Sequence, residues 1–460
     1  MKINKNQLLV ILYVLATTLL LLWPAIFNGY PLVTEDSGNY IHMSGTLKPL
    51  SFRPIGYAFF IRIFGFNGWS LWPVIIVQSI FANSIFLIVF KMLFSKKHFI
   101  LLHLIALSIA SFFTGFAWYA SQVMTDIFVV VLFFMLFIVF FKKNLRIWQY
   151  LLLGFSFCWL AMMHYSMLIF LWGSLFIALV VFLIRFKNLK GSRFHYRLIT
   201  LFSALVVSMV AATTYTASFD SPTEYGSGKY VFMMGRICEA GILEKYLNEN
   251  CQYYDFSICE YKDQLPDLAL EFVWGSKSPF RMADIGFLEA DREYKLIFKD
   301  IVTTPKYLFE LVFVDGFRQT ITQMYTMKIG FGLYSHSKEQ GFFKALVRTF
   351  PSEEDNYLAS REYTKRLNFG YWNTVNPIIL ILSLIIIVWI LSFYKVDYLV
   401  RVLSAISFSG YVLNAAIVSN MANVSWRLGG RAAYVFVFLA VILLASLLTN
   451  KYKRRSYRKP

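Results

Sequence analysis

The chain has 460 residues, of which 58% are hydrophobic, 19% are aromatic and only 15% are charged. This composition excludes an ordinary soluble domain and is typical of a membrane protein. The net charge of +18 does not indicate nucleic-acid binding, because Lys and Arg gather in short segments between apolar runs. That placement follows the positive-inside rule for cytoplasmic loops, so we expect a lipid bilayer and no nucleic acid as a partner.

Ten apolar runs predict ten membrane-spanning helices and therefore an all-α polytopic fold. Their approximate bounds are 7–27, 72–93, 99–117, 123–141, 148–164, 166–184, 198–218, 376–394, 402–419 and 432–449. An even number of spans places both termini in the cytoplasm. The basic tail at 451–460 is then expected to lie against anionic cytoplasmic lipid.

Two polar segments are predicted on the extracytoplasmic side, at 28–71 and at 219–372. The second is too long for a plain loop, and its periodicity is mostly helical. It also holds 22 of the 26 acidic residues. The chain is therefore expected to divide into an N-terminal transmembrane module (1–218), an extracytoplasmic domain (219–372), and C-terminal transmembrane helices with the basic tail (373–460).

Two of the four cysteines, Cys251 and Cys259, lie eight residues apart in the larger outer segment. An exported segment meets an oxidising compartment, so we expect a disulfide between them, with two free thiols as the alternative. No Cys and His spacing typical of a zinc site is present.

The first outer segment carries the sequence "TEDSGNY", in which Glu35 and Asp36 are two of only four acids outside 219–372. We expect this motif in a loop just outside the membrane, near Arg53 of "FRPIGYAFF". A functional role is favoured for Asp36, with Glu35 assisting. The alternative is that Asp36 forms a turn or caps a helix N-terminus.

Other charged residues are predicted at the outer ends of later spans. Asp126 either faces Asp36 across an aqueous pocket or is stabilised by the dipole of the helix that it begins. Arg427 and Arg431 share one helical face, and the two glycines between them would let backbone amides approach an anion. This pattern suits a phosphate, whereas the alternative is snorkelling of arginine to the membrane surface. His164 is either a packing residue or part of the same site.

Two carboxylates that face one pocket can act as a general base, position a hydroxyl group or hold a divalent cation. The cofactor is therefore left open, with Mg²⁺ or Mn²⁺ held by Asp36 and Asp126 as one option.

Together these features resemble the GT-C superfamily of membrane glycosyltransferases, which includes protein O-mannosyltransferases and the aminoarabinose transferase of lipid A. "RPIGYAFF" is similar to the "R-x-P-G-Y-P" region that follows the catalytic acid in several of those enzymes, with the second small residue shifted. The chain also resembles a group of uncharacterised bacterial polytopic proteins with "DTGTY"-like first loops and an "R…R" pair before the last span. In this chain those features are "DSGNY" and the pair Arg427 and Arg431.

The resemblance implies transfer of a sugar from a polyprenyl-phosphate donor to a glycan, lipid or protein acceptor. It implies that Asp36 is the general base and that Asp126 and Glu35 are further acids of the catalytic site. The residues that it places near the substrate or its lipid phosphate are Arg53, Tyr57, His164, Arg427 and Arg431. It also implies a bacterial inner membrane, with the active site on the extracytoplasmic face. Many relatives carry longer C-terminal domains, which leaves the acceptor-binding surface of this chain open.

A transporter or flippase of lipid-linked saccharides is the alternative from another class of function. Transport calls for broken spans or polar midplane residues in related halves of the chain, and the sequence has neither an internal repeat nor an acid in the middle of a span. A saccharide polymerase or ligase would share the large outer segment, and the sequence separates it poorly from the transferase.

Overall fold

The computed structural model describes residues 5–50, 52–95, 98–185, 193–219 and 228–456. These residues form helices and contain no β-strand; extended pairing is limited to two isolated bridges, Leu32 with Gln122 and Leu50 with Arg53. The all-α class predicted from the sequence is therefore confirmed. Residues 457–460, at the end of the predicted basic tail, lie outside the described part of the chain.

Seven helical segments in the described part are long and apolar enough to cross a membrane. They are α1 (Lys5–Asn28), α4 (Trp72–Leu93), α9 (Tyr165–Ile184), α11 (Phe194–Ala217), α21 (Gly370–Phe393), α22 (Tyr398–Met421), and Trp426–Thr449, which joins α23 (Trp426–Ala433) to α24 (Val435–Ser456). Three shorter apolar helices lie where the other three spans were expected: α5 (Phe99–Phe113), α7 (Phe128–Phe141) and α8 (Ile147–Met163). The chain is a multi-pass membrane protein by the length and composition of its helices.

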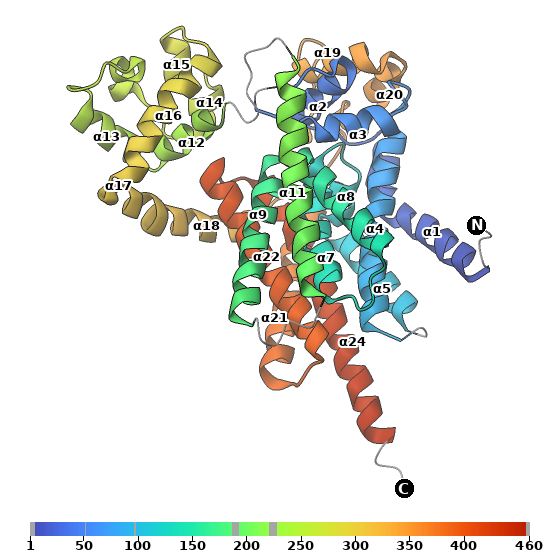
Figure 1. Ribbon diagram of the computed structural model, residues 1–460. Helices are drawn as coiled ribbons and strands as arrows, with labels where there is room; N and C mark the ends of the chain where they lie inside the picture. Colours follow the sequence, from blue (N-terminus) through green and yellow to red (C-terminus); the bar gives the residue numbers. More distant parts are fainter. Residues whose placement is uncertain (1–4, 51, 96–97, 186–192, 220–227, 457–460) are drawn as a thin grey trace.

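The short helix α7 lies inside the bundle, and every residue from Phe128 to Phe140 is buried. It packs against α4, α8 and α22 (Figure 1). A helix that is apolar all round is stable when other helices surround it, which explains why the sequence of α7 has no polar face.

One end of the bundle is covered by the first polar segment together with part of the second. Here α2 (Glu35–Thr46) and α3 (Gly56–Phe64) pack with α19 (Gly341–Thr349), η4 (Pro351–Glu353) and α20 (Glu354–Ala359) (Figure 1). The contact of α2 with α19 is close because a Cβ at Gly38 would lie 2.7 Å from Cα of Phe342. We call this end the cap side of the bundle.

Another part of the long polar segment, 228–315, forms a separate lobe beside the bundle (Figure 1). Its elements are α12 (Lys229–Glu239), α13 (Ile242–Asn250), η2 (Ser257–Gln264), α14 (Ala269–Trp274), α15 (Pro279–Met282), α16 (Phe287–Thr303), α17 (Pro305–Phe309) and η3 (Glu310–Asp315), followed by α18 (Gly316–Tyr325). The sequence groups 219–372 as one domain, but its buried residues divide among three hydrophobic clusters, the smallest of which joins Ile329 and Leu333 to Leu32 and Trp118. The lobe has its own core, whereas 342–357 joins the core of the bundle.

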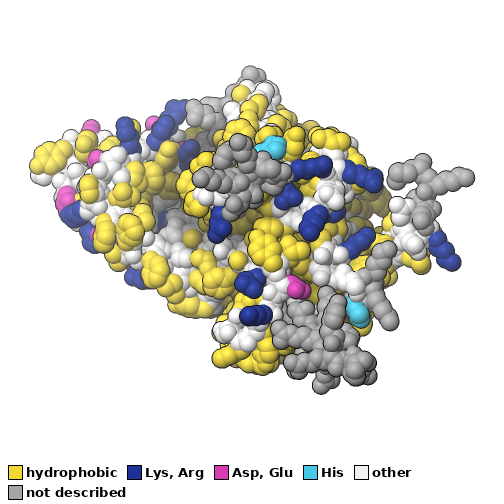
Figure 2. Space-filling view, turned by 60° about the horizontal axis from the view of Figure 1, so that its bottom comes forward, with side chains coloured by type: hydrophobic (Ala, Val, Ile, Leu, Met, Phe, Trp, Pro, Cys, Tyr) yellow, Lys and Arg dark blue, Asp and Glu magenta, His cyan; other side chains and the backbone are white. Residues whose placement is uncertain are grey.

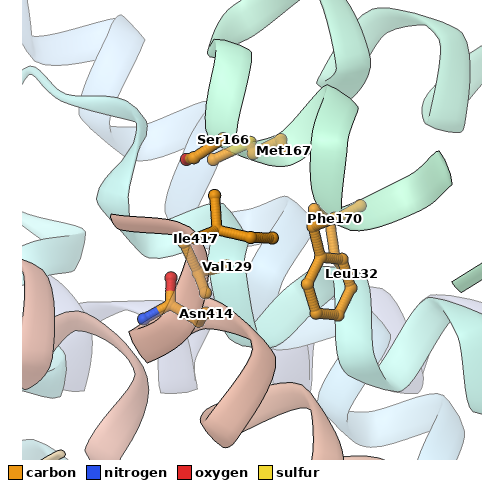
Figure 3. A pocket seen from close by; sticks show the side chains of 7 residues that line it. All are labelled: Val129, Leu132, Ser166, Met167, Phe170, Asn414 and Ile417. Atoms are coloured by element: carbon orange, nitrogen blue, oxygen red, sulfur yellow. The ribbon is translucent and has the colours of Figure 1, made fainter. Parts of the chain in front are cut away.

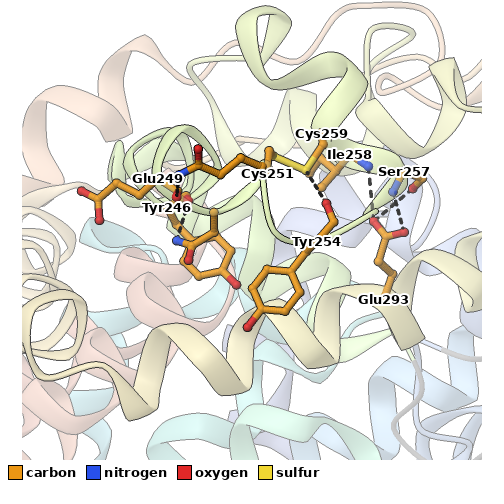
Figure 4. The surroundings of a disulfide bond; sticks show 10 residues. Tyr246, Glu249, Cys251, Tyr254, Ser257, Ile258, Cys259 and Glu293 are labelled. Carbon is orange, nitrogen blue, oxygen red and sulfur yellow. Dashed lines mark hydrogen bonds between the residues drawn. A yellow bond between two sulfur atoms is a disulfide. The ribbon is translucent and has the colours of Figure 1, made fainter.

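The lobe contains the predicted disulfide between Cys251 and Cys259 (Figure 4). The backbone N–H of Ser257 donates to the Glu293 carboxylate at 2.9 Å, so the loop closed by the disulfide is also held to α16. Cys158 and Cys238 are free cysteines.

Candidate functional site

Five charged side chains from separate parts of the chain meet on the cap side of the bundle. They are Asp36 of α2, Arg53 before α3, Asp126 in a 3₁₀ turn before α7, and Arg427 and Arg431 of α23. We call this group the charged cluster. Most of the site residues expected from the sequence are thus brought together, and the directly paired Asp36 and Arg427 are 391 residues apart along the chain.

The motif "TEDSGNY" begins helix α2, so the prediction that it forms a loop is wrong. Thr34 is the N-cap, and its backbone N–H donates to Ser37 Oγ at 2.9 Å. A hydroxyl residue three positions after an N-cap completes a reciprocal capping arrangement, and carboxylates are favoured in the first turn by the helix dipole. Capping therefore belongs to Thr34, and the alternative that Asp36 is the cap is also wrong.

Asp36 is held between two arginines. Its Oδ1 accepts a hydrogen bond from Arg53, and its Oδ2 accepts one from Nη2 of Arg427 at 2.6 Å. Burial alone would raise the pKa of Asp36, but the Arg53 and Arg427 charges outweigh it and hold this pKa well below its usual range. The side chain is still 26% exposed, so solvent reaches the carboxylate. In this arrangement Asp36 is ionised and is a weak proton acceptor.

Asp126 lies deeper and has arginine partners of its own. Its Oδ1 is 3.0 Å from Nη1 of Arg431, and its Oδ2 is 3.3 Å from Nε of Arg427. The Asp126 side chain is 1% exposed and that of Arg431 is 0% exposed. The acid therefore pairs with arginine rather than with the helix dipole alone, and Arg427 links it to Asp36.

The guanidinium of Arg431 continues the network toward His164. Its Nη2 donates to Asn414 Oδ1 at 2.9 Å and to Ser166 Oγ at 3.1 Å. Ser166 Oγ lies 2.8 Å from Nδ1 of His164, which caps the start of α9. Ser166 and Asn414 also form the polar wall of a small hollow between α7, α9 and α22 (Figure 3). His164 thus belongs to the site indirectly, through a hydroxyl group.

The two glycines between the arginines do not offer free amides to an anion, which corrects that part of the prediction. Gly429 lies inside α23, and its N–H donates to the Ser425 carbonyl at 3.2 Å. A Cβ at Gly430 would lie 2.3 Å from the hydroxyl oxygen of Tyr119, which itself donates to the Arg427 carbonyl at 3.1 Å. These glycines let α23 pack closely against its neighbours.

Two expected residues lie apart from the charged cluster. Glu35 is exposed and accepts a hydrogen bond from the Tyr334 hydroxyl at 2.9 Å. Tyr57 is fully buried, donates to Gln78 Oε1 at 2.9 Å, and packs edge-on against Tyr40 with ring centroids 5.1 Å apart. Tyr57 therefore contributes to the site only through its packing against Tyr40. Glu35 is next to Asp36 in the sequence, but its side chain pairs with Tyr334 and not with the arginines.

Sequence reasoning missed Tyr40, Ser166 and Asn414. Tyr40 lies under Arg53, with the guanidinium carbon 5.4 Å from the ring centroid. Its position four residues after Asp36 is the spacing of one helical face, which would have identified it once the motif was read as a helix. Ser166 and Asn414 carry no comparable signal, because polar residues in apolar helices are often simple packing groups.

The carboxylates of the charged cluster do not fit a divalent cation. All four of the oxygens of Asp36 and Asp126 face guanidinium nitrogens. Mg²⁺ and Mn²⁺ need such oxygens free as ligands. Within the described ranges, no group of three or more His, Cys, Asp or Glu residues is placed to hold a metal ion.

The three arginines outnumber the two aspartates, which leaves one positive charge in excess. Nε of Arg53 is also buried without a hydrogen-bond partner among the described residues. No protein-family model, curated protein or solved structure matches the chain. The chemistry of the site is therefore argued from its geometry, which suits an anion bound beside a carboxylate that solvent can reach.

Proposed function

We propose that this chain is a membrane glycosyltransferase of the GT-C type that moves a sugar from a polyprenyl-phosphate donor to a hydroxyl acceptor. The observation that carries the proposal is the pairing of Asp36, which is 26% exposed, with Arg427, which also contacts Asp126. The reaction needs a binding site for the donor phosphate directly beside a group that accepts a proton. The excess of arginine can bind the phosphate, and Asp36 can accept the proton.

The proposed topology has ten spans, with both termini in the cytoplasm and the cap side on the extracytoplasmic face of a bacterial inner membrane. Three short apolar helices supply the spans beyond the seven long ones. Basic segments such as 141–146 then fall on the cytoplasmic side. In this topology the charged cluster lies at the outer surface, where a lipid-linked sugar can reach it.

In the proposed reaction an acceptor hydroxyl oxygen attacks the anomeric carbon of the donor sugar. The new glycosidic C–O bond forms as the bond from that carbon to the phosphate oxygen breaks, and the hydroxyl proton passes to Asp36. The polyprenyl phosphate leaves with the bonding electron pair, and Arg53 and Arg427 stabilise its charge. General-base catalysis contributes about 10²–10⁴-fold, and preorganised positive charge at the leaving group adds a comparable or larger effect.

The paired state of Asp36 makes its basicity depend on the donor. A phosphate that accepts hydrogen bonds from Arg53 and Arg427 competes with Asp36 for the same donors. Each guanidinium that turns to the phosphate weakens its hold on the carboxylate, so the pKa of Asp36 rises toward its ordinary value. The base is thereby released when the donor is bound.

The test uses the purified full-length protein with its native lipid and with labelled polyprenyl-phosphate sugars. We expect a polyprenyl phosphate to co-purify with the wild type, as measured by mass spectrometry, and to be lost from Arg427→Ala. The exposed Arg366 provides a matched control, because Arg366→Ala removes the same charge on the cap side without touching the cluster.

Asp36→Asn is expected to keep the lipid but to lose sugar transfer by about 100-fold or more. Full transfer by Asp36→Asn would contradict the assignment of the base. Movement of the labelled lipid across the membrane of proteoliposomes without chemical change would show that the protein acts as a flippase and would refute the transferase proposal.

A further inference from the structure

A nearly continuous helical run from α17 through η3 to α18 connects the lobe to the bundle and carries an apolar stripe. The members of the stripe recur every fourth residue: Phe309, Phe313, Phe317, Ile321 and Tyr325. Their exposed fractions lie between 43% and 67%. Residues four apart are neighbours on a helix surface. A strict repeat of four drifts around an α-helix, but the π-helical segment η3 has more residues per turn and offsets part of that drift, so these residues form one exposed row.

The other face of this run is bound to the lobe at its N-terminal half. Glu310 pairs with Lys245 of α13, and Asp315 pairs with the buried Arg236 of α12. The orientation of the run is therefore fixed by ion pairs on one side. The apolar stripe points away from them and has no described part of the chain over it.

The C-terminal half packs along α22, which is one of the candidate spans. Asn420 donates to the Gly316 carbonyl at 3.3 Å, and the Tyr411 hydroxyl donates to the Met324 carbonyl. Asn420 and Tyr411 are nine residues apart, which is about 13 Å along a helix. Since the hydrocarbon layer is about 30 Å thick, α18 lies beside the part of α22 that belongs to the leaflet on the lobe's side.

We propose that the helical run 305–325 is embedded in that leaflet, with its apolar stripe in contact with lipid. Two further exposed apolar side chains, Met421 (38%) and Trp426 (47%), directly follow Asn420 and Ser425, which hydrogen-bond to residues of α18. On the face shown in Figure 2, hydrophobic side chains are spread over the left and central parts of the molecule, among Lys and Arg side chains. Aromatic residues are preferred where membrane and water meet, and an aqueous surface rarely exposes so long an apolar row.

The embedded run also positions the charged cluster. Nε2 of Gln323 donates to the Ser425 carbonyl at 2.9 Å, and the Ser425 N–H donates back to Oε1 of Gln323 at 2.8 Å. Ser425 is the N-cap of α23, which carries Arg427 two residues later. The contact of α18 with lipid therefore sets the depth at which α23 begins. This inference requires only that the bundle spans a membrane, and it does not rest on the transferase proposal.

The experiment measures the surroundings of spin labels on the full-length protein in vesicles of phosphatidylcholine and phosphatidylglycerol. Labels are attached at Phe313→Cys or Phe317→Cys after Cys158 and Cys238 are replaced by alanine, with the lobe disulfide kept. Tyr253, which is 74% exposed on the lobe, provides the matched aqueous control as Tyr253→Cys. We expect the ratio of collision rates with oxygen and with a water-soluble nickel chelate to be several-fold higher at 313 and 317 than at 253.

Equal access of the nickel chelate at all three positions would overturn the inference. Dipolar broadening between labels at 313 on different molecules would also overturn it, because the stripe would then be covered by a second copy of the chain. Neither substitution on the stripe removes a buried contact, and retention of the wild-type Tm by each labelled protein verifies that it is folded.

Discussion

Replacing Asp126 by asparagine removes one charge from a pair that water does not reach. Asp126 is the carboxylate partner of Arg431 among the described residues, and their side chains are 1% and 0% exposed. Loss of one member of a buried ion pair leaves the other charge desolvated and uncompensated, at a cost of about 3–5 kcal/mol. Asp36 is 26% exposed, and the arginines that Asp36→Asn would leave behind, Arg53 and Arg427, are 14% and 15% exposed. Solvent therefore compensates part of the loss there, and Arg427 keeps Asp126 as a partner, so the cost is expected to be smaller than at Asp126.

Thermal unfolding in detergent measures this difference. In a Cys238→Ala background, Cys158 of α8 is the remaining free cysteine, so a thiol-reactive dye reports unfolding of the bundle. One kcal/mol shifts the Tm of a domain of 150–250 residues by about 2–4 °C. We expect Asp126→Asn to lower the Tm by several degrees and by more than Asp36→Asn does.

The double variant Asp126→Asn/Arg431→Gln distinguishes the cost of leaving a buried charge unpaired from the cost of disturbed side-chain packing. It removes both buried charges, so it should be more stable than Asp126→Asn alone, with a coupling energy of about 0.5–3 kcal/mol. The reasoning fails if the two substitutions add, or if Asp126→Asn and Asp36→Asn shift the Tm equally.

Three further predictions concern the cap side and the lobe. Burial raises the pKa of Glu362 well above its usual range, so the folded chain binds this proton more tightly than the unfolded chain, and stability falls as pH rises from about 4.3 through the folded pKa. Glu362→Gln can keep the bond accepted from the Val33 N–H, and its Tm advantage over the wild type should grow from pH 5 to pH 8; a constant difference would contradict the assignment. Gly430→Ala should displace α23 and weaken binding of lipid phosphate, measured by co-purification, because its Cβ would lie 2.3 Å from the Tyr119 hydroxyl oxygen. Tyr119→Phe removes that oxygen and should restore part of the loss, whereas Gly430→Ala with unchanged binding would refute the packing argument. Replacing Cys251 and Cys259 by serine opens a loop of eight residues and should destabilise the lobe by about 2–3 kcal/mol. The lobe has its own core, so dye labelling of Cys238 should move to lower temperature while that of Cys158 does not, and parallel shifts would show that the two parts unfold together.

Helix positions and the cysteine pair could be predicted from local sequence alone. Apolar runs and loop composition depend on neighbouring residues, which is why the predicted spans match the helices closely. The failure at "TEDSGNY" was also local. Thr34 and Ser37 already contain the capping pattern, and Glu35 and Asp36 are the acids that a first helical turn favours.

The sequence by itself determined that the chain is helical and membrane-embedded, that acids are rare outside 219–372, and that Arg427 and Arg431 share a helical face. Only the tertiary structure decided which charges meet. Glu35 and Asp36 are adjacent in sequence, but successive residues point about 100° apart around a helix. Glu35 therefore turns to Tyr334, whereas Asp36 turns to arginines that come from distant segments. The tertiary structure also decided that Asp126 is buried and that Asp36 is partly exposed, because the exposure of a carboxylate depends on the helices packed around it.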